Sequence, residues 1–279
     1  MIKRIITGLI LVACLVGVLF LREVTAYCFD ALIFLILIAS MYELCSAFSK
    51  IGIKCNLWCL GISVVLYVLG CYLITIPMAF IISIAVALVW FTFSKNGDIR
   101  ALLATIFAMV YPSVLLYYGL ILNHLSAGLV LILLVFLVAI LTDTFAYFVG
   151  SIVKGPKLCP TISPKKTVSG AIGGVVGGIL GALLLYFCFE VWHVFGISNS
   201  ILTLGISNSI WIYLAIGVLG SILDEIGDLV SSQIKRKTGI KDFGNIFPGH
   251  GGVLDRIDGI SFVMAGVGIF VQIMFLIAK

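Results

Sequence analysis

Long apolar runs, separated by short polar segments, follow one another along most of this chain. A helix needs about 20 apolar residues to cross the roughly 30 Å hydrocarbon core of a bilayer. The pattern predicts about nine membrane-spanning helices, although only Thr75 and Pro77 interrupt the third and fourth runs, so whether both cross fully stays open. The predicted ranges are 5–21, 26–48, 57–73, 76–93, 101–122, 126–149, 168–189, 210–231 and 259–278.

Composition supports a membrane protein and excludes other classes. Of the 279 residues, 62% are apolar and 10% are charged, whereas soluble domains have about 45–50% apolar and about 25% charged residues. A soluble chain of this size could not bury so much apolar surface. Intrinsic disorder is also excluded, because disordered chains contain too few apolar residues to collapse, whereas this chain is rich in them. The cysteines lie mostly within apolar runs, which argues against a secreted disulfide scaffold. We therefore expect an all-α, polytopic integral membrane protein.

The distribution of basic residues predicts the orientation, because cytoplasmic loops are enriched in Lys and Arg. If the amino terminus is cytoplasmic, nine spans place 15 of the 17 basic residues inside and leave only Arg22 and Lys279 outside. We therefore expect a cytoplasmic amino terminus. The net charge of +5 follows from this asymmetry and gives no reason to expect a nucleic-acid partner.

Two cytoplasmic segments, residues 150–167 and 235–258, are richer in polar residues than the others. We expect amino-terminal transmembrane helices in residues 1–125 and a carboxyl-terminal transmembrane catalytic region in residues 126–279. The seventh run contains GAIGGVVGGILG, whose glycines recur every four residues on one helix face and allow close helix packing. Packing within the monomer and packing at a homodimer interface both remain open.

Acidic residues within the predicted spans are the first candidates for chemistry, because ionisable groups at membrane depth are costly and usually functional. For Asp143, a structural hydrogen bond and a role in lining a polar cavity both remain open. Asp224 and Asp228 lie one helical turn apart and precede Ser232 on the same face. Such carboxylates repel unless a cation lies between them, and Mg²⁺ favours oxygen ligands. Glu43, near the cytoplasmic end of its run, is expected to be solvated or to snorkel toward the membrane surface.

Both cytoplasmic loops combine cations, hydroxyls and glycines. Lys165 and Lys166 precede the glycine-rich helix, and a helix amino terminus beside lysines favours anions. After Lys235 and Arg236, a Gly- and Pro-rich segment around His250 can present backbone N–H groups to anions. This combination suits a nucleoside triphosphate, or phosphoryl or nucleotidyl transfer at a lipid headgroup.

The stretch from Ser232 to Asp258 reads SQIKRKTGIKDFGNIFPGHGGVLDRID. It closely resembles the signature of phosphatidate cytidylyltransferases, also called CDP-diacylglycerol synthases, and the SPKKT segment resembles a second motif of that family. The resemblance implies a nucleotidyltransferase that makes CDP-diacylglycerol and pyrophosphate from CTP and phosphatidate for phospholipid synthesis. It places the active site at the cytoplasmic face of a bacterial-type inner (plasma) membrane. It also implies Mg²⁺, accompanied by a monovalent cation such as K⁺.

The resemblance also suggests roles for individual residues. Asp228 and Asp255 would be the metal-binding carboxylates, and we add Asp224 as a third metal candidate. The expected catalytic residues are Asp228, Asp255, Lys235, Arg236 and His250. Those expected to contact substrate phosphates or the nucleotide are Ser163, Lys165, Lys166, Thr167, Ser232, Lys241, Asp242, Gly251, Gly252, Arg256 and Asp143.

An ion-coupled membrane transporter with acidic intramembrane sites is the alternative function. It would account for the spans and for acids within them. It would not account for a glycine-rich, histidine-containing loop with acids on both sides.

Overall fold

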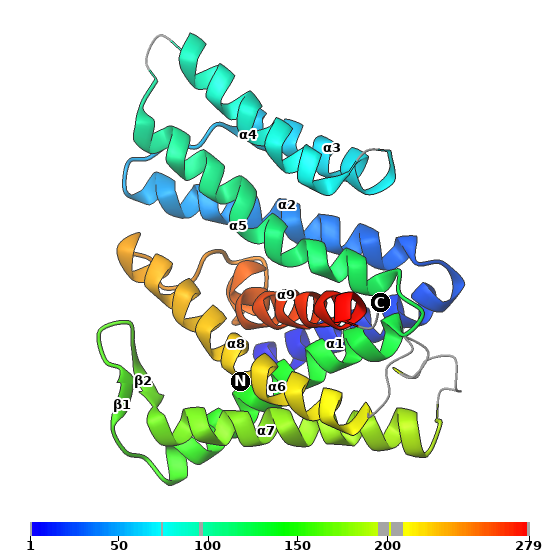
Figure 1. The fold of residues 1–279 in the computed structure, drawn as a ribbon. Helices are drawn as coiled ribbons and strands as arrows, with labels where there is room; N and C mark the ends of the chain where they lie inside the picture. Colours follow the sequence, from blue (N-terminus) through cyan, green and yellow to red (C-terminus); the bar gives the residue numbers. More distant parts are fainter. Residues whose placement is uncertain (1, 74, 95–96, 195–200, 202–208, 278–279) are drawn as a thin grey trace. The chain divides into compact units, whose positions relative to one another are not determined.

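The computed structural model describes the chain except residues 1, 74, 95–96, 195–200, 202–208 and 278–279 (Figure 1). Helices make up most of the described residues. In chain order the elements are α1 (Ile2–Val24), α2 (Tyr27–Lys50), α3 (Leu57–Tyr72), α4 (Ile76–Phe93), α5 (Ile99–Asn123), α6 (Gly128–Ile152), β1 (Lys157–Cys159), β2 (Ser163–Thr167), α7 (Val168–Tyr186), the π-helical turn η1 (Phe187–Val191), α8 (Ser209–Lys237) and α9 (Leu254–Ile277).

Every predicted run contains an α-helix, which confirms the all-α, polytopic class. Eight helices in the described residues are long and apolar enough to cross a membrane. The helix of the third predicted run, α3, is not one of these eight. It has 16 residues and extends about 24 Å at 1.5 Å per residue, which is less than the thickness of the hydrocarbon core. Lys279 and most of the segment between η1 and α8, both predicted to lie outside the cytoplasm, fall outside the described residues.

The chain divides into two compact units built from interleaved segments. The first comprises residues 1–11, 31–114 and 235–255, and the second comprises 12–30, 115–234 and 256–279. In the first unit, α3 packs against α4 through small residues: a Cβ added to Gly70 would lie 2.8 Å from the Cβ of Ala79. Asn56 caps α3 by accepting a hydrogen bond from the Cys59 amide at 3.0 Å.

In the second unit, the glycine-rich helix α7 packs closely against α6, beside which it runs in Figure 1. A Cβ added to Gly177 would lie 2.5 Å from the Leu141 carbonyl oxygen, so only glycine fits this contact. A Cβ added to Gly174 would lie 2.6 Å from Oε1 of Glu225 on α8. The glycines therefore serve packing inside the chain, which was one of the two alternatives. A homodimer stays a prediction.

The first polar loop contains a feature that the hydrophobic pattern did not predict, a small antiparallel hairpin formed by β1 and β2. Lys157 pairs with Thr167, and Cys159 pairs with Ser163. Thr167 then caps α7, because its hydroxyl accepts a hydrogen bond from the Gly170 amide at 3.1 Å. The hairpin thus leads directly into the glycine-rich helix.

We expect Gly177→Ala to destabilise the protein, because the new methyl group would press on backbone of α6 that cannot easily move. Overpacking of this kind costs about 1–3 kcal/mol, so the thermal unfolding midpoint in detergent should fall by several degrees. Gly61→Ala is the matched control, because a Cβ at Gly61 meets nothing within 4 Å. An unchanged midpoint for Gly177→Ala would contradict the close packing of α6 and α7.

Candidate functional site

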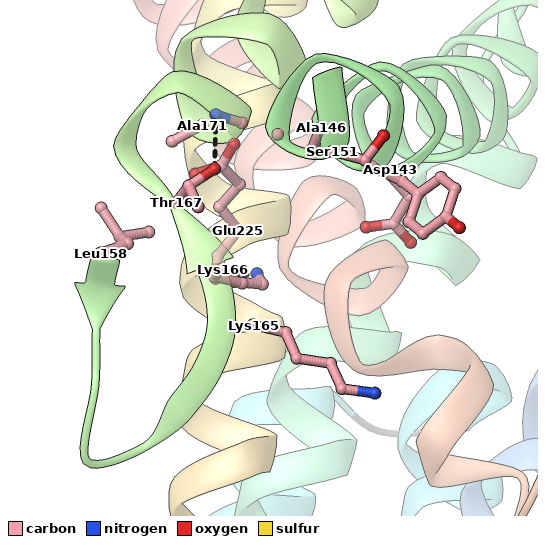
Figure 2. Close-up of a pocket in the computed structure, with 12 residues that line it drawn as sticks. Asp143, Ala146, Ser151, Leu158, Lys165, Lys166, Thr167, Ala171 and Glu225 are labelled. Carbon is pink, nitrogen blue, oxygen red and sulfur yellow. Dashed lines mark hydrogen bonds between the residues drawn. The ribbon is translucent and has the colours of Figure 1, made fainter. Parts of the chain in front are cut away.

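A cavity of about 290 Å³ lies beside the hairpin in the second unit (Figure 2). It brings together two lysines from β2, Asp143 from α6 and Glu225 from α8. We call it the hairpin cavity. Its lining residues are Asp143, Ala146, Tyr147, Gly150, Ser151, Leu158, Lys165, Lys166, Thr167, Gly170, Ala171 and Glu225. Asp143 is therefore a lining residue, one of its two predicted alternatives.

The two adjacent lysines of β2 have different surroundings. The Lys166 ammonium forms an ion pair with Asp228 Oδ2 at 2.7 Å and donates to the Glu225 carbonyl oxygen at 3.4 Å. Lys165 is exposed and forms no ion pair with any described residue. Lys166 is thus an internal counter-ion, whereas the charge of Lys165 is available to a ligand.

Lys166 stands among an acid cluster that we define as Asp143, Asp224, Glu225 and Asp228. Asp224 is only 2% exposed and lies against Gly259 of α9. Oε1 of Glu225 is buried and accepts no hydrogen bond from the described residues. Lys166 acts electrostatically on Asp143, Asp224 and Glu225, and the exposed Arg256 also acts on Asp143.

The acid cluster offers carboxylate oxygens, the type of ligand that a hard divalent cation prefers. Within the described residues, however, no three His, Cys, Asp or Glu side chains converge closely enough to hold a metal by themselves. Mg²⁺ does not need such a cage, because it keeps several waters and is commonly held by one or two carboxylates plus substrate phosphates. The donor set therefore fits Mg²⁺ accompanied by a phosphate ligand.

Asp255 belongs to the first unit and is tied to its surroundings by three contacts. Its Oδ2 accepts hydrogen bonds from the amides of Phe243 at 2.7 Å and Gly252 at 2.9 Å. Its Oδ1 accepts a hydrogen bond from the Lys235 ammonium at 2.8 Å. The same ammonium group lies 5.4 Å from the centre of the Phe243 ring. Asp255 is therefore an anchor for the loop before α9, a role that its sequence pattern did not reveal.

Glu43 is buried, not solvated, so that expectation was wrong. The residue is 2% exposed, and its carboxylate oxygens accept hydrogen bonds from the amides of Val253 and Leu254, each at 2.8 Å. The sequence gives no signal for this contact, because the partners lie more than 200 residues apart along the chain.

The remaining predicted residues occupy diverse surroundings. His250 is half-buried; its amide donates to the Phe247 carbonyl oxygen at 2.9 Å, and its buried Nδ1 has no hydrogen-bond partner among the described residues. Ser163 lies in β2 and Ser232 in α8, both half-buried, and Gly251 has a positive φ of 87°. Among these remaining residues, the exposed ones are Arg236, Lys241, Asp242 and Arg256.

Comparison with known proteins agrees with the resemblance seen in the sequence. The model of the Cytidylyltransferase family matches residues 2–274. The chain belongs to this family. The match covers both units, and therefore both the hairpin cavity and the loop anchored by Asp255.

Curated relatives of this family member carry a more specific name. This chain is 38% identical over 139 residues to a phosphatidate cytidylyltransferase of Staphylococcus haemolyticus. It is 39% identical over 140 residues to one of Staphylococcus aureus, and 40% identical over 139 residues to one of Staphylococcus saprophyticus. Each match covers 50% of this chain and 48% of the relative, so the chain spans about half the length of these relatives.

We expect Lys166→Gln to lower the thermal unfolding midpoint in detergent, because it removes the ammonium group that pairs with Asp228. Both partners of the pair with Asp228 are partly exposed, so the loss should be on the order of 1 kcal/mol. Lys165→Gln is the matched control and should leave the midpoint unchanged. Equal midpoints for both variants would contradict the distinction between the two lysines.

Proposed function

We propose that this family member transfers the cytidylyl group of CTP to phosphatidate, which gives CDP-diacylglycerol and pyrophosphate. The match to the family model over residues 2–274, together with relatives named phosphatidate cytidylyltransferase, carries the proposal. The cavity supports it because it combines a free lysine with the amino terminus of α7. No observation favours the ion-coupled transporter.

The chemistry asks the protein mainly for electrostatic stabilisation. A phosphate oxygen of phosphatidate attacks the α-phosphorus of CTP, and pyrophosphate leaves. The nucleophile is already ionised, so no strong general base is needed. Two anions must approach while charge develops on the leaving group, and fixed cations and N–H dipoles lower that barrier.

The structure suggests how the two lysines divide this work. Lys165, with its exposed ammonium, would contact a substrate phosphate close to the amino terminus of α7, where the helix dipole also favours anions. Lys166 would keep the carboxylates of the acid cluster in place, because its ammonium is already paired with Asp228. This assigns the phosphate contact to Lys165 and the counter-ion role to Lys166.

We propose Mg²⁺ as the metal, held by Asp228 and Asp224 together with substrate phosphates, and a monovalent cation such as K⁺ beside it. When bound, Mg²⁺ would neutralise charge on the phosphates. Asp255 would contribute chiefly by holding the loop, because both of its oxygens already accept hydrogen bonds. His250 and Arg236 stay predicted catalytic residues.

We expect the purified protein to incorporate radiolabelled CTP into lipid when phosphatidate and Mg²⁺ are present, without any ion gradient. Asp228→Asn should reduce turnover at least 100-fold while the protein stays folded in detergent, because it removes a ligand charge and little volume. Glu23→Gln, which alters a half-exposed acid of α1, is the control and should remain active. Near-normal turnover of Asp228→Asn at saturating Mg²⁺ would refute its metal role.

The proposed site requires the hairpin and the loop before α9 to face the cytoplasm of a bacterial-type inner membrane, because CTP is cytoplasmic. Single cysteines at Thr161 and Asn245, in a background without the 8 native cysteines, should react with an impermeant reagent only after permeabilisation. A cysteine at the exposed Ser126, in the turn between α5 and α6, should react in intact cells. Labelling of Asn245 in intact cells would show the opposite orientation.

A further inference from the structure

The amino-terminal end of α9 depends on a distant residue for its cap. The first N–H groups of a helix have no partner within the helix, and usually a Ser, Thr, Asp or Asn just before it accepts their hydrogen bonds. Gly252 and Val253 precede α9 and offer no such side chain. The Glu43 carboxylate of α2 takes this place, with both oxygens 2.8 Å from the amides of Val253 and Leu254.

The loop before α9 encloses the Glu43 carboxylate closely. A Cβ added to Gly244 would lie 2.5 Å from Glu43 Oε1, and a Cβ added to Gly252 would also clash with that oxygen. The carboxylate is therefore seated between two glycines that leave room for it. Its negative charge is stabilised by charge-assisted hydrogen bonds at the positive end of the helix dipole.

Glu43 and Asp255 together fix the segment that leads into α9. Asp255 accepts hydrogen bonds from Phe243 and Gly252, whereas Glu43 holds the two residues that follow Gly252. The segment between these points contains His250 and Gly251, and the predicted nucleotide contacts of residues 241–242 come just before it. Its conformation is thus set by two buried carboxylates.

We propose that Glu43 is a positioning residue of the transferase. It holds residues 241–252 and the start of α9 in the conformation that receives CTP, and it does so through backbone amides without touching the substrate. This inference rests on the proposed function. It gives α2, which carries none of the family motifs, a direct part in the site.

The test is Glu43→Gln in the full chain, purified in detergent and assayed well below its unfolding midpoint. Gln keeps the size of Glu but turns an NH₂ group toward one of the two amides. Hydrogen exchange in the peptide that contains Val253 and Leu254 should become at least tenfold faster. The KM for CTP should rise at least fivefold, whereas a mere loss of folded protein would lower the maximal rate and leave KM unchanged.

Asp30→Asn is the matched control, because Asp30 lies on the same helix, is also 2% exposed, and accepts a hydrogen bond from Asn123 at 2.8 Å. It should lower thermal stability without changing exchange at Val253 and Leu254 or the KM for CTP. If Glu43→Gln does not fold, Glu43→Asp, which keeps the charge on a shorter side chain, should show at least a twofold rise in KM.

The outcomes separate this inference from the proposed function. An active wild-type enzyme whose folded variants at position 43 keep normal exchange and a normal KM for CTP would overturn the inference alone. A normal KM with faster exchange would also overturn it, because Glu43 would then stabilise the helix only. A folded wild-type protein that fails to label lipid from CTP would refute the proposed function, whatever the exchange shows.

Discussion

Neutralisation of buried carboxylates is the constraint on which the rest of this structure depends. An ionised carboxylate in apolar surroundings is stable only when cations or hydrogen-bond donors lie close to it. The chain meets this need in two ways. In the second unit, Lys166 pairs with the partly exposed Asp228 and acts electrostatically on the buried Asp224. In the first unit, Glu43 and Asp255 accept hydrogen bonds from backbone amides, and Asp255 also forms an ion pair with Lys235.

The same constraint explains why two adjacent lysines have different tasks. In β2, Lys166 is partly buried and pairs with Asp228 of the acid cluster, whereas its neighbour Lys165 is exposed. Their sequence as a basic pair suggested a common role in binding phosphates. That prediction treated the two lysines alike because the short strand, unlike the long helices, has no hydrophobic pattern from which it could be predicted.

Features set by local pattern could be predicted from the sequence, and features set by distant contacts could not. The helices follow from apolar runs, and the start of α7 follows from Thr167 beside a glycine-rich segment. The packing of Gly177 follows from its spacing with other small residues. The burial of Glu43 depends on amides at the other end of the chain, and no local pattern reports such a partner.

The structural contacts of Asp255 restrict any part that this carboxylate takes in chemistry. Each carboxylate oxygen has two lone pairs. Oδ2 of Asp255 already accepts two amide hydrogen bonds, which fills it, whereas Oδ1 accepts only from Lys235 among the contacts described above. A metal could therefore be reached only through Oδ1, beside the Lys235 ammonium. Its two oxygens thus separate the tasks: Oδ2 fixes the loop, and Oδ1 is the atom on which any direct role in the reaction depends.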